Sequence, residues 1–129
     1  MSTIIASNIS DGTTSVPSTY VVNGSAKAWV NFTGTGSVTI NDSLNTSSLS
    51  DIGTGNYRVY YTTSMSNVNY SITIAGASAT AGSAGSGKNI GTYTEYNLVN
   101  SAGVSCFTAD AAAYEDPTRA FFQVAGDLA

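Results

Sequence analysis

The acidic side chains are the residues of this chain with the clearest capacity for chemistry. Eight Asp and Glu residues are spread over 129 positions, and the chain contains no histidine. Without histidine the chain lacks the usual general base, the commonest metal ligand and any Ser-His or Cys-His nucleophile. A glycosidase needs two carboxylates across a cleft, but Asp42 and Asp51 each stand beside turn residues, where Asp favours local hydrogen bonds. We therefore predict that the protein is not an enzyme.

Two short motifs imitate ligand sites, and both are incomplete. Asp51–Asn56 places oxygen donors at alternate positions, as in a calcium loop, but lacks the further carboxylates of such a loop and is better explained as a glycine turn. The glycine-rich stretch before Lys88 does not have P-loop spacing, and no helix follows it. The single cysteine, Cys106, is expected to be a small buried hydrophobe. No cofactor or metal is expected.

Charged residues are scarce. They make up 9% of the chain, against roughly 25% in an ordinary globular protein, and Ser, Thr, Asn and Gly supply the polarity instead. The four cations, which are far apart in sequence, are Lys27, Arg58, Lys88 and Arg119. A net charge of −4 with no basic stripe disfavours nucleic-acid binding. A surface of hydroxyls and amides packs against a neighbouring protein at low desolvation cost, so the composition suits an assembly; a secreted β-domain is the alternative.

Targeting signals are not evident. The opening MSTIIASNIS has no basic segment and no long apolar run, so we do not expect a signal peptide. No apolar stretch approaches the roughly 20 residues that span a bilayer. We therefore expect synthesis in a cytoplasm and no membrane insertion.

Period-two alternation dominates the chain and predicts an all-β fold. In AKAWVNFT (26–33) the alternate residues Ala28, Val30 and Phe32 share one face. This segment and 37–42 predict a hairpin around a glycine turn. Further strands are expected at 48–52, 57–62, 70–75, 90–99, 104–108 and 119–125, the last with Phe121 and Phe122 on opposite faces. Ala77–Lys88 predicts a surface loop, and Ala109–Tyr114 at most a helical turn. The pattern predicts a β-sandwich of about seven to nine short antiparallel strands.

The first 24 residues differ from the rest. Thr3–Ile9 suits a short strand, and Asp11–Pro17 suits a linker. We interpret 1–24 as an N-terminal docking arm and linker, and 25–129 as the sandwich module. The apolar residues expected to dock are Ile4, Ile5, Ile9 and Val16. An edge strand of the same domain is the alternative for this segment.

Aromatic residues are the remaining candidates for binding. Trp29, Tyr60 and Tyr96 are expected on faces opposite the apolar ones, where Tyr and Trp give good contacts to saccharide or protein. With Lys88 they form our set of candidate surface-contact residues. The alternative is that these rings cover the second sheet or a subunit interface.

The stretch from Ala26 resembles a module found in structural proteins and tail fibres of bacteriophages, especially those of marine bacteria and cyanobacteria. The segments that carry the resemblance are AKAWVNFTGTGSVTINDSLNTSSLSDIGTGNYRVYYTTSM at 26–65, VNYSITIAG at 68–76 and DPTRAFFQVAGD at 116–127. The resemblance covers about residues 26–127 and brings no catalytic residues. It implies a virion structural protein, usually near the end of a fibre and often a homotrimer.

Fibre proteins of this type carry a long shaft, whereas only about 25 residues precede the module here. We therefore expect a short tail-fibre-like appendage or fibre tip that docks on other phage structural proteins through its arm. Its loops would contact host surface polysaccharide or protein. The alternative is a capsid decoration protein, either a cement protein or a head fibre. Its location would be the virion in either case.

Overall fold

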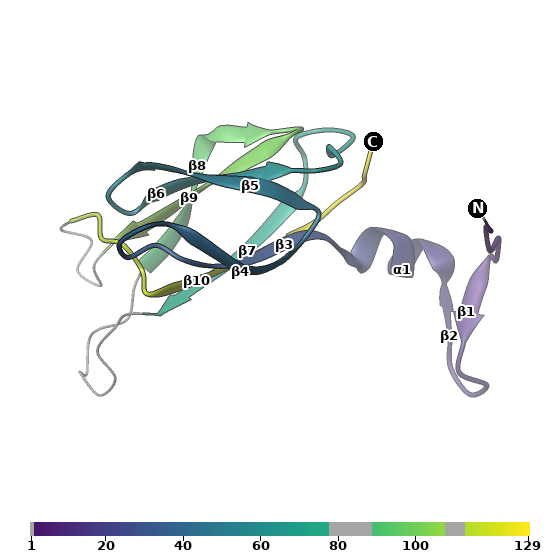
Figure 1. Cartoon of the computed structure of the whole chain (residues 1–129). Helices are drawn as coiled ribbons and strands as arrows, with labels where there is room; N and C mark the ends of the chain where they lie inside the picture. Colours follow the sequence, from purple (N-terminus) through teal and green to yellow (C-terminus); the bar gives the residue numbers. More distant parts are fainter. Residues whose placement is uncertain (1, 78–88, 108–112) are drawn as a thin grey trace.

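Ten β-strands and one short helix are present in the computed structural model, which describes residues 2–77, 89–107 and 113–129 (Figure 1). The N-terminal arm contains β1 (Asn8–Ser10), β2 (Ser15–Pro17) and α1 (Ser18–Gly24). The other strands are β3 (Ala26–Thr33), β4 (Thr39–Leu44), β5 (Thr46–Gly53), β6 (Asn56–Tyr61), β7 (Ser71–Ala77), β8 (Asn89–Leu98), β9 (Ser101–Phe107) and β10 (Arg119–Ala125). The predicted surface loop at Ala77–Lys88 lies outside the described residues except for Ala77, and the predicted helical turn at Ala109–Tyr114 lies outside them except for Ala113 and Tyr114.

The eight strands after the arm form two four-stranded antiparallel sheets that pack face to face (Figure 1). One sheet has the order β4-β3-β10-β7 and the other β5-β6-β9-β8. The prediction of an all-β sandwich is confirmed, and so is the hairpin of β3 with β4. The central pairs β3–β10 and β6–β9 join segments from distant parts of the chain.

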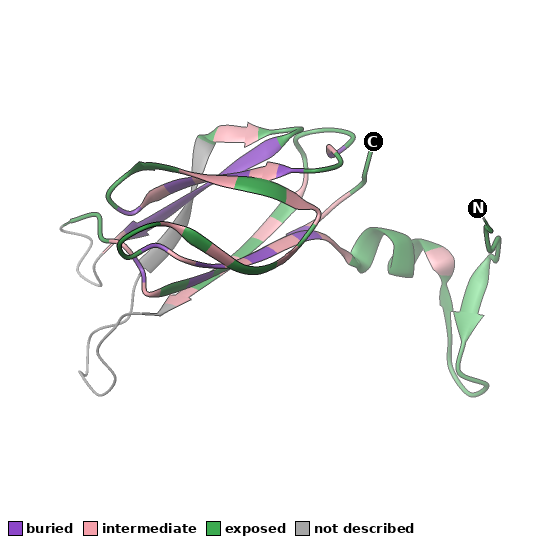
Figure 2. Ribbon diagram, viewed as in Figure 1, coloured by how far each residue is buried: buried purple, intermediate pink, exposed green. Residues whose placement is uncertain are grey.

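The core lies between the sheets and is built from the alternate residues of the four central strands (Figure 2). Its largest buried side chains on these strands are Phe32, Tyr57 and Phe122, and the Cys106 thiol is buried among them. Phe32 and Tyr57 meet edge-to-face across the two sheets, with ring centroids 5.0 Å apart. Burying each such side chain stabilises the fold by roughly 1.5–3 kcal/mol, which makes this interior the main source of stability.

One end of the sandwich is closed by a polar contact beneath this ring pair. The Tyr57 hydroxyl and the Gly55 N–H both donate to Oδ1 of Asp116, each at 2.7 Å. The next residue, Pro117, is buried, and its carbonyl accepts from Gly34 N at 2.8 Å. The segment before β10 thereby joins the β3–β4 turn of one sheet to the β5–β6 turn of the other.

The crossing from β4 to β5 is made at a single residue. Asn45 adopts a left-handed conformation with φ 52°, which Asn tolerates better than most residues. Its side-chain amide donates to the carbonyls of Lys27 and Thr63, each at 3.0 Å, and its Oδ1 accepts from Thr63 N at 2.6 Å. The side chain thus stabilises the corner that takes the chain from one sheet to the other.

The arm departs from the sequence-based expectation in two places. The predicted linker at Asp11–Pro17 holds the turn of a hairpin and β2, which pairs with β1. The residues after it form the helix α1, whereas at most one helical turn was expected, elsewhere in the chain. The segment STYVVNG contains Tyr20, Val21 and Val22, residue types that favour strands over helices. The helix is short, has no side-chain N-cap bond and buries none of its residues. Its C-terminal end is instead held by Lys27 of β3, whose Nζ donates to the carbonyls of Val22 and Ser25.

A first prediction concerns Gly55, which has φ +69°. A Cβ here would collide with the Cys106 carbonyl oxygen and lie 2.8 Å from Glu115 N. We expect Gly55→Ala to lower the free energy of unfolding by about 3 kcal/mol or more, since strain and overpacking add. Gly36 has φ +71° and open space around it, so Gly36→Ala is the matched control with an expected loss of about 1 kcal/mol. Equal losses in urea titrations would contradict the packing argument.

A second prediction separates two buried tyrosine hydroxyls. Tyr57 donates to a carboxylate, whereas the Tyr61 hydroxyl has no hydrogen-bond partner in the described part of the chain. We expect Tyr57→Phe to lower the free energy of unfolding by about 1.5–3 kcal/mol, the usual size of a hydrogen bond to a charged group. Tyr61→Phe removes an unpaired polar atom and should be neutral or slightly stabilising.

The pH dependence provides an independent readout for these variants. Burial, together with the Asp116 carboxylate, raises the pKa of Tyr57 above the ordinary value of 10.0, and burial raises the pKa of Tyr61. Both side chains therefore stay protonated in the fold while the unfolded chain ionises, so stability is lost as the pH rises above 10.0. Each Phe variant should lose less stability per pH unit there; identical slopes in all three proteins would contradict this assignment.

Candidate functional site

The arm is the least buried part of the described chain (Figure 2). It projects from the sandwich as a β1–β2 hairpin followed by α1 (Figure 1). The hairpin turn is held by Asp11, whose Oδ1 accepts from Thr13 N at 2.9 Å and Thr14 N at 2.8 Å. These backbone bonds lower the pKa of the Asp11 carboxyl. The arm therefore has local structure of its own.

Exposed apolar side chains run along the whole arm. Ile4 and Ile5 are each 94% exposed, and Tyr20 is 72% exposed. The remaining exposed apolar residues of the arm are Ile9, Val16, Val21 and Val22. A segment with so much apolar surface and a single charged residue, Asp11, is typical of a surface that another protein covers. Sequence reasoning identified four of these residues and missed the three on α1, because α1 itself was not foreseen.

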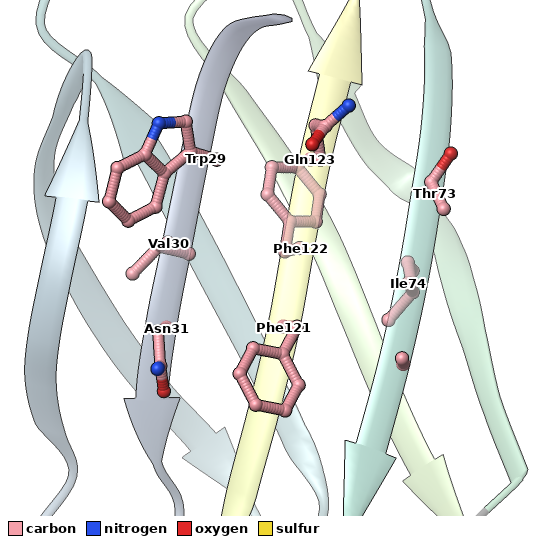
Figure 3. Close-up of a pocket in the computed structure, with 9 residues that line it drawn as sticks. Trp29, Val30, Asn31, Thr73, Ile74, Phe121, Phe122 and Gln123 are labelled. Atoms are coloured by element: carbon pink, nitrogen blue, oxygen red, sulfur yellow. The ribbon is translucent and has the colours of Figure 1, made fainter.

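A second candidate surface is the outer face of the β4-β3-β10-β7 sheet. A shallow pocket of about 290 Å³ lies there over the central strands (Figure 3). We name it the Trp29–Phe121 pocket; the outward side chains that line it are Trp29, Asn31, Thr73, Ala75, Phe121 and Gln123. Trp29 is half-buried and Phe121 is 42% exposed. The prediction that Phe121 and Phe122 face opposite ways is confirmed, because Phe122 is buried.

The opposite outer face holds an arginine between two tyrosines. The guanidinium carbon of Arg58 lies 4.8 Å from the ring centroid of Tyr60 and 4.9 Å from that of Tyr96. Nε and Nη2 of Arg58 donate to the Ser101 hydroxyl at 3.1 and 3.0 Å. Such cation–π contacts and the paired hydrogen bonds fix both rings over β9.

The candidate surface-contact residues therefore do not form one site. Trp29 lies on one sheet, Tyr60 and Tyr96 on the other, and Lys88 lies outside the described residues. Sequence reasoning missed Phe121 and Gln123 as partners of Trp29, since only the pairing of β3 with β10 brings them together. That pairing has no local sequence signal.

The carboxylates considered for catalysis serve local structure. Asp42 Oδ1 accepts from Ser43 N at 2.8 Å, and Asp51 Oδ1 accepts from Gly53 N at 3.0 Å. Asp51 thus closes the β5–β6 turn, which is the glycine turn expected from the sequence. Within the ranges that the structure describes, no group of three or more metal-ligating side chains occurs. No described helix is long and apolar enough to cross a membrane.

Comparison with known proteins adds no relative. No protein-family model, curated protein or solved structure matches this chain.

A third prediction tests the structural role of the Tyr60–Arg58–Tyr96 stack. We expect Arg58→Ala to lower the free energy of unfolding by about 1–2 kcal/mol, because two cation–π contacts and two hydrogen bonds are lost. Arg58→Lys keeps the charge without the planar fork and should recover part of the loss. Arg119→Ala is the control, since Arg119 is exposed at the start of β10. An Arg58→Ala protein as stable as this control in thermal and urea unfolding would show that the stack contributes nothing.

Proposed function

We propose that this protein is a structural protein of a bacteriophage particle. It is a short tail-fibre-like appendage or fibre-tip module, assembled as a homotrimer, that docks on other phage proteins through its arm and contacts the host surface with its sandwich. The virion is its location. The resemblance of 26–65, 68–76 and 116–127 to phage fibre modules supports this proposal.

The observation that carries the docking role is the exposed apolar arm. The seven large apolar side chains from Ile4 to Val22 are 40–94% exposed in this structure. Full burial by a partner would contribute roughly 1.5–3 kcal/mol for Ile4 or Ile5, which are each 94% exposed, and less for the side chains that are already half-buried. An arm of this kind binds by adding its apolar surface and its hairpin to a groove or sheet edge of a neighbouring protein.

A fourth prediction tests docking by the arm. The triple variant Ile4→Ser, Ile5→Ser, Tyr20→Ser should unfold at the same urea concentration as the parent protein, because these side chains are exposed. Its copy number in purified particles should fall at least tenfold, measured by quantitative mass spectrometry. The matched control is Ile52→Ser with Val68→Ser, two exposed apolar side chains of the sandwich, 45% and 51% exposed.

Deletion of residues 1–24 is the second arm variant. It should leave a folded module that no longer joins the particle. A truncated protein that does not fold would show that the arm belongs to the domain, and a triple variant incorporated normally would rule out docking through these side chains. The copy number also decides the location: tens of copies at most fit a tail appendage, whereas hundreds in a lattice indicate head decoration instead.

A further inference from the structure

The Trp29–Phe121 pocket alternates aromatic rings with carboxamides. Across β3, β10 and β7, one row of paired residues is Trp29, Gln123 and Thr73, and the next is Asn31, Phe121 and Ala75. Trp29 and Phe121 are therefore diagonal neighbours, and so are Asn31 and Gln123. Diagonal positions on antiparallel strands lie about 7–8 Å apart, so one extended ligand can contact both rings and both amides.

The polar groups of the pocket are available to a ligand, and one is already oriented. Asn41 Nδ2 donates to Asn31 Oδ1 at 3.2 Å, which fixes the Asn31 amide and leaves its Nδ2 to donate outward. Gln123 is exposed beside it and offers both a donor and an acceptor. The small side chain of Ala75, which pairs with Phe121, leaves space in the pocket, and so does that of Thr73 on the same strand. Figure 3 shows Thr73 and Phe121 on neighbouring strands. The pocket thus combines apolar faces with hydrogen-bonding groups held on rigid strands.

This combination discriminates among ligands. Among the residues that the structure describes, no charged side chain lines the pocket, which gives no basis for binding a phosphate or a carboxylate. An apolar face of another protein would cover the rings but leave the Asn31 and Gln123 amides without partners, at about 1–3 kcal/mol for each buried unsatisfied group. A sugar ring offers C–H groups to the aromatic faces and hydroxyls to the amides, so it satisfies both.

We propose that the Trp29–Phe121 pocket binds one or two units of a neutral saccharide, with Trp29 and Phe121 contacting the sugar rings and Asn31 and Gln123 bonding their hydroxyls. The volume of about 290 Å³ is close to the lower limit, about 300 Å³, of small-molecule pockets and suits a ligand of that size. The claim that this saccharide belongs to the host surface rests on the proposed function. The claim that the pocket binds a neutral saccharide does not depend on that function.

A fifth prediction uses the single tryptophan of the chain, Trp29, as a reporter in the pocket. The full-length protein is titrated with neutral hexasaccharides of glucose, galactose, mannose and xylose, and with hexasaccharides of galacturonic acid. At least one neutral sugar should change the Trp29 emission saturably, with a dissociation constant on the order of 1 mM, because an open pocket buries little of its ligand.

Variants locate the site, with binding followed by saturation-transfer NMR so that the fluorescence of Trp29 is not needed. Phe121→Ala should weaken binding about tenfold or more, as expected when a stacking surface is lost. Thr73→Tyr fills the pocket, suits a strand and should abolish binding while keeping Trp29, Phe121, Asn31 and Gln123. Tyr114→Ala is the control, because Tyr114 is an exposed ring (51%) remote from the pocket on the chain segment before β10. The parent protein and the three variants are compared at equal folded fraction, which is measured by urea unfolding.

Each outcome has a defined meaning. Absence of a saturable response to every neutral sugar overturns the proposal, as does a response to the acidic sugar alone. Binding unchanged in Thr73→Tyr overturns the location. A dimer or trimer in sedimentation that Thr73→Tyr disrupts would assign this face to self-association instead. Thr73→Tyr protein should enter particles normally while the arm variant binds sugar normally, so failure of one proposal does not affect the other.

Discussion

The hydrogen bonds to Asp116 join parts of the chain that lie far apart in sequence. Its carboxylate accepts from the hydroxyl of Tyr57, a residue 59 positions earlier, and from the Gly55 backbone. Tyr57 then crosses the core to meet Phe32 of the facing sheet. Because the following Pro117 holds the β3–β4 turn, strand β10 enters between β3 and β7 with its register set. The outward rows of residues that include Trp29 and Phe121 follow from that register.

The aromatic side chains on the two outer faces of the sandwich have different surroundings. On the β5-β6-β9-β8 sheet, the small residues of β9 are covered by Arg58, whose guanidinium group is held by Ser101 and two tyrosine rings. The guanidinium group covers the faces of the Tyr60 and Tyr96 rings, and these contacts stabilise the fold. On the other sheet, no cation among the described residues lines the pocket of Trp29 and Phe121, and the amides of Asn31 and Gln123 lie beside the rings. Aromatic residues that look equivalent in sequence therefore differ in their capacity to bind.

The strands were predictable because their signal is local. Alternation in AKAWVNFT and NYRVYY depends only on which residues meet the core, so the sandwich class and the inward residues follow from it. The pairing of β3 with β10 and of β6 with β9 joins strands that are far apart in the sequence. The alternation of apolar and polar residues within a strand does not indicate which distant strand will be its partner. The pocket and the arginine stack arise from these pairings. The helix α1 escaped prediction because its valines and tyrosine favour strands when taken alone.

The scarcity of charge now has a structural explanation in two places. In the arm, the single charged side chain is Asp11, and its carboxylate accepts hydrogen bonds from its own turn at Thr13 N and Thr14 N. In the pocket, uncharged amides replace the ion pairs of an ordinary sheet surface. Both surfaces would bind a neutral partner with little desolvation cost, and salt would screen neither contact. An arm that associates through apolar burial and a sheet face that associates through rings and amides both remain effective at high ionic strength.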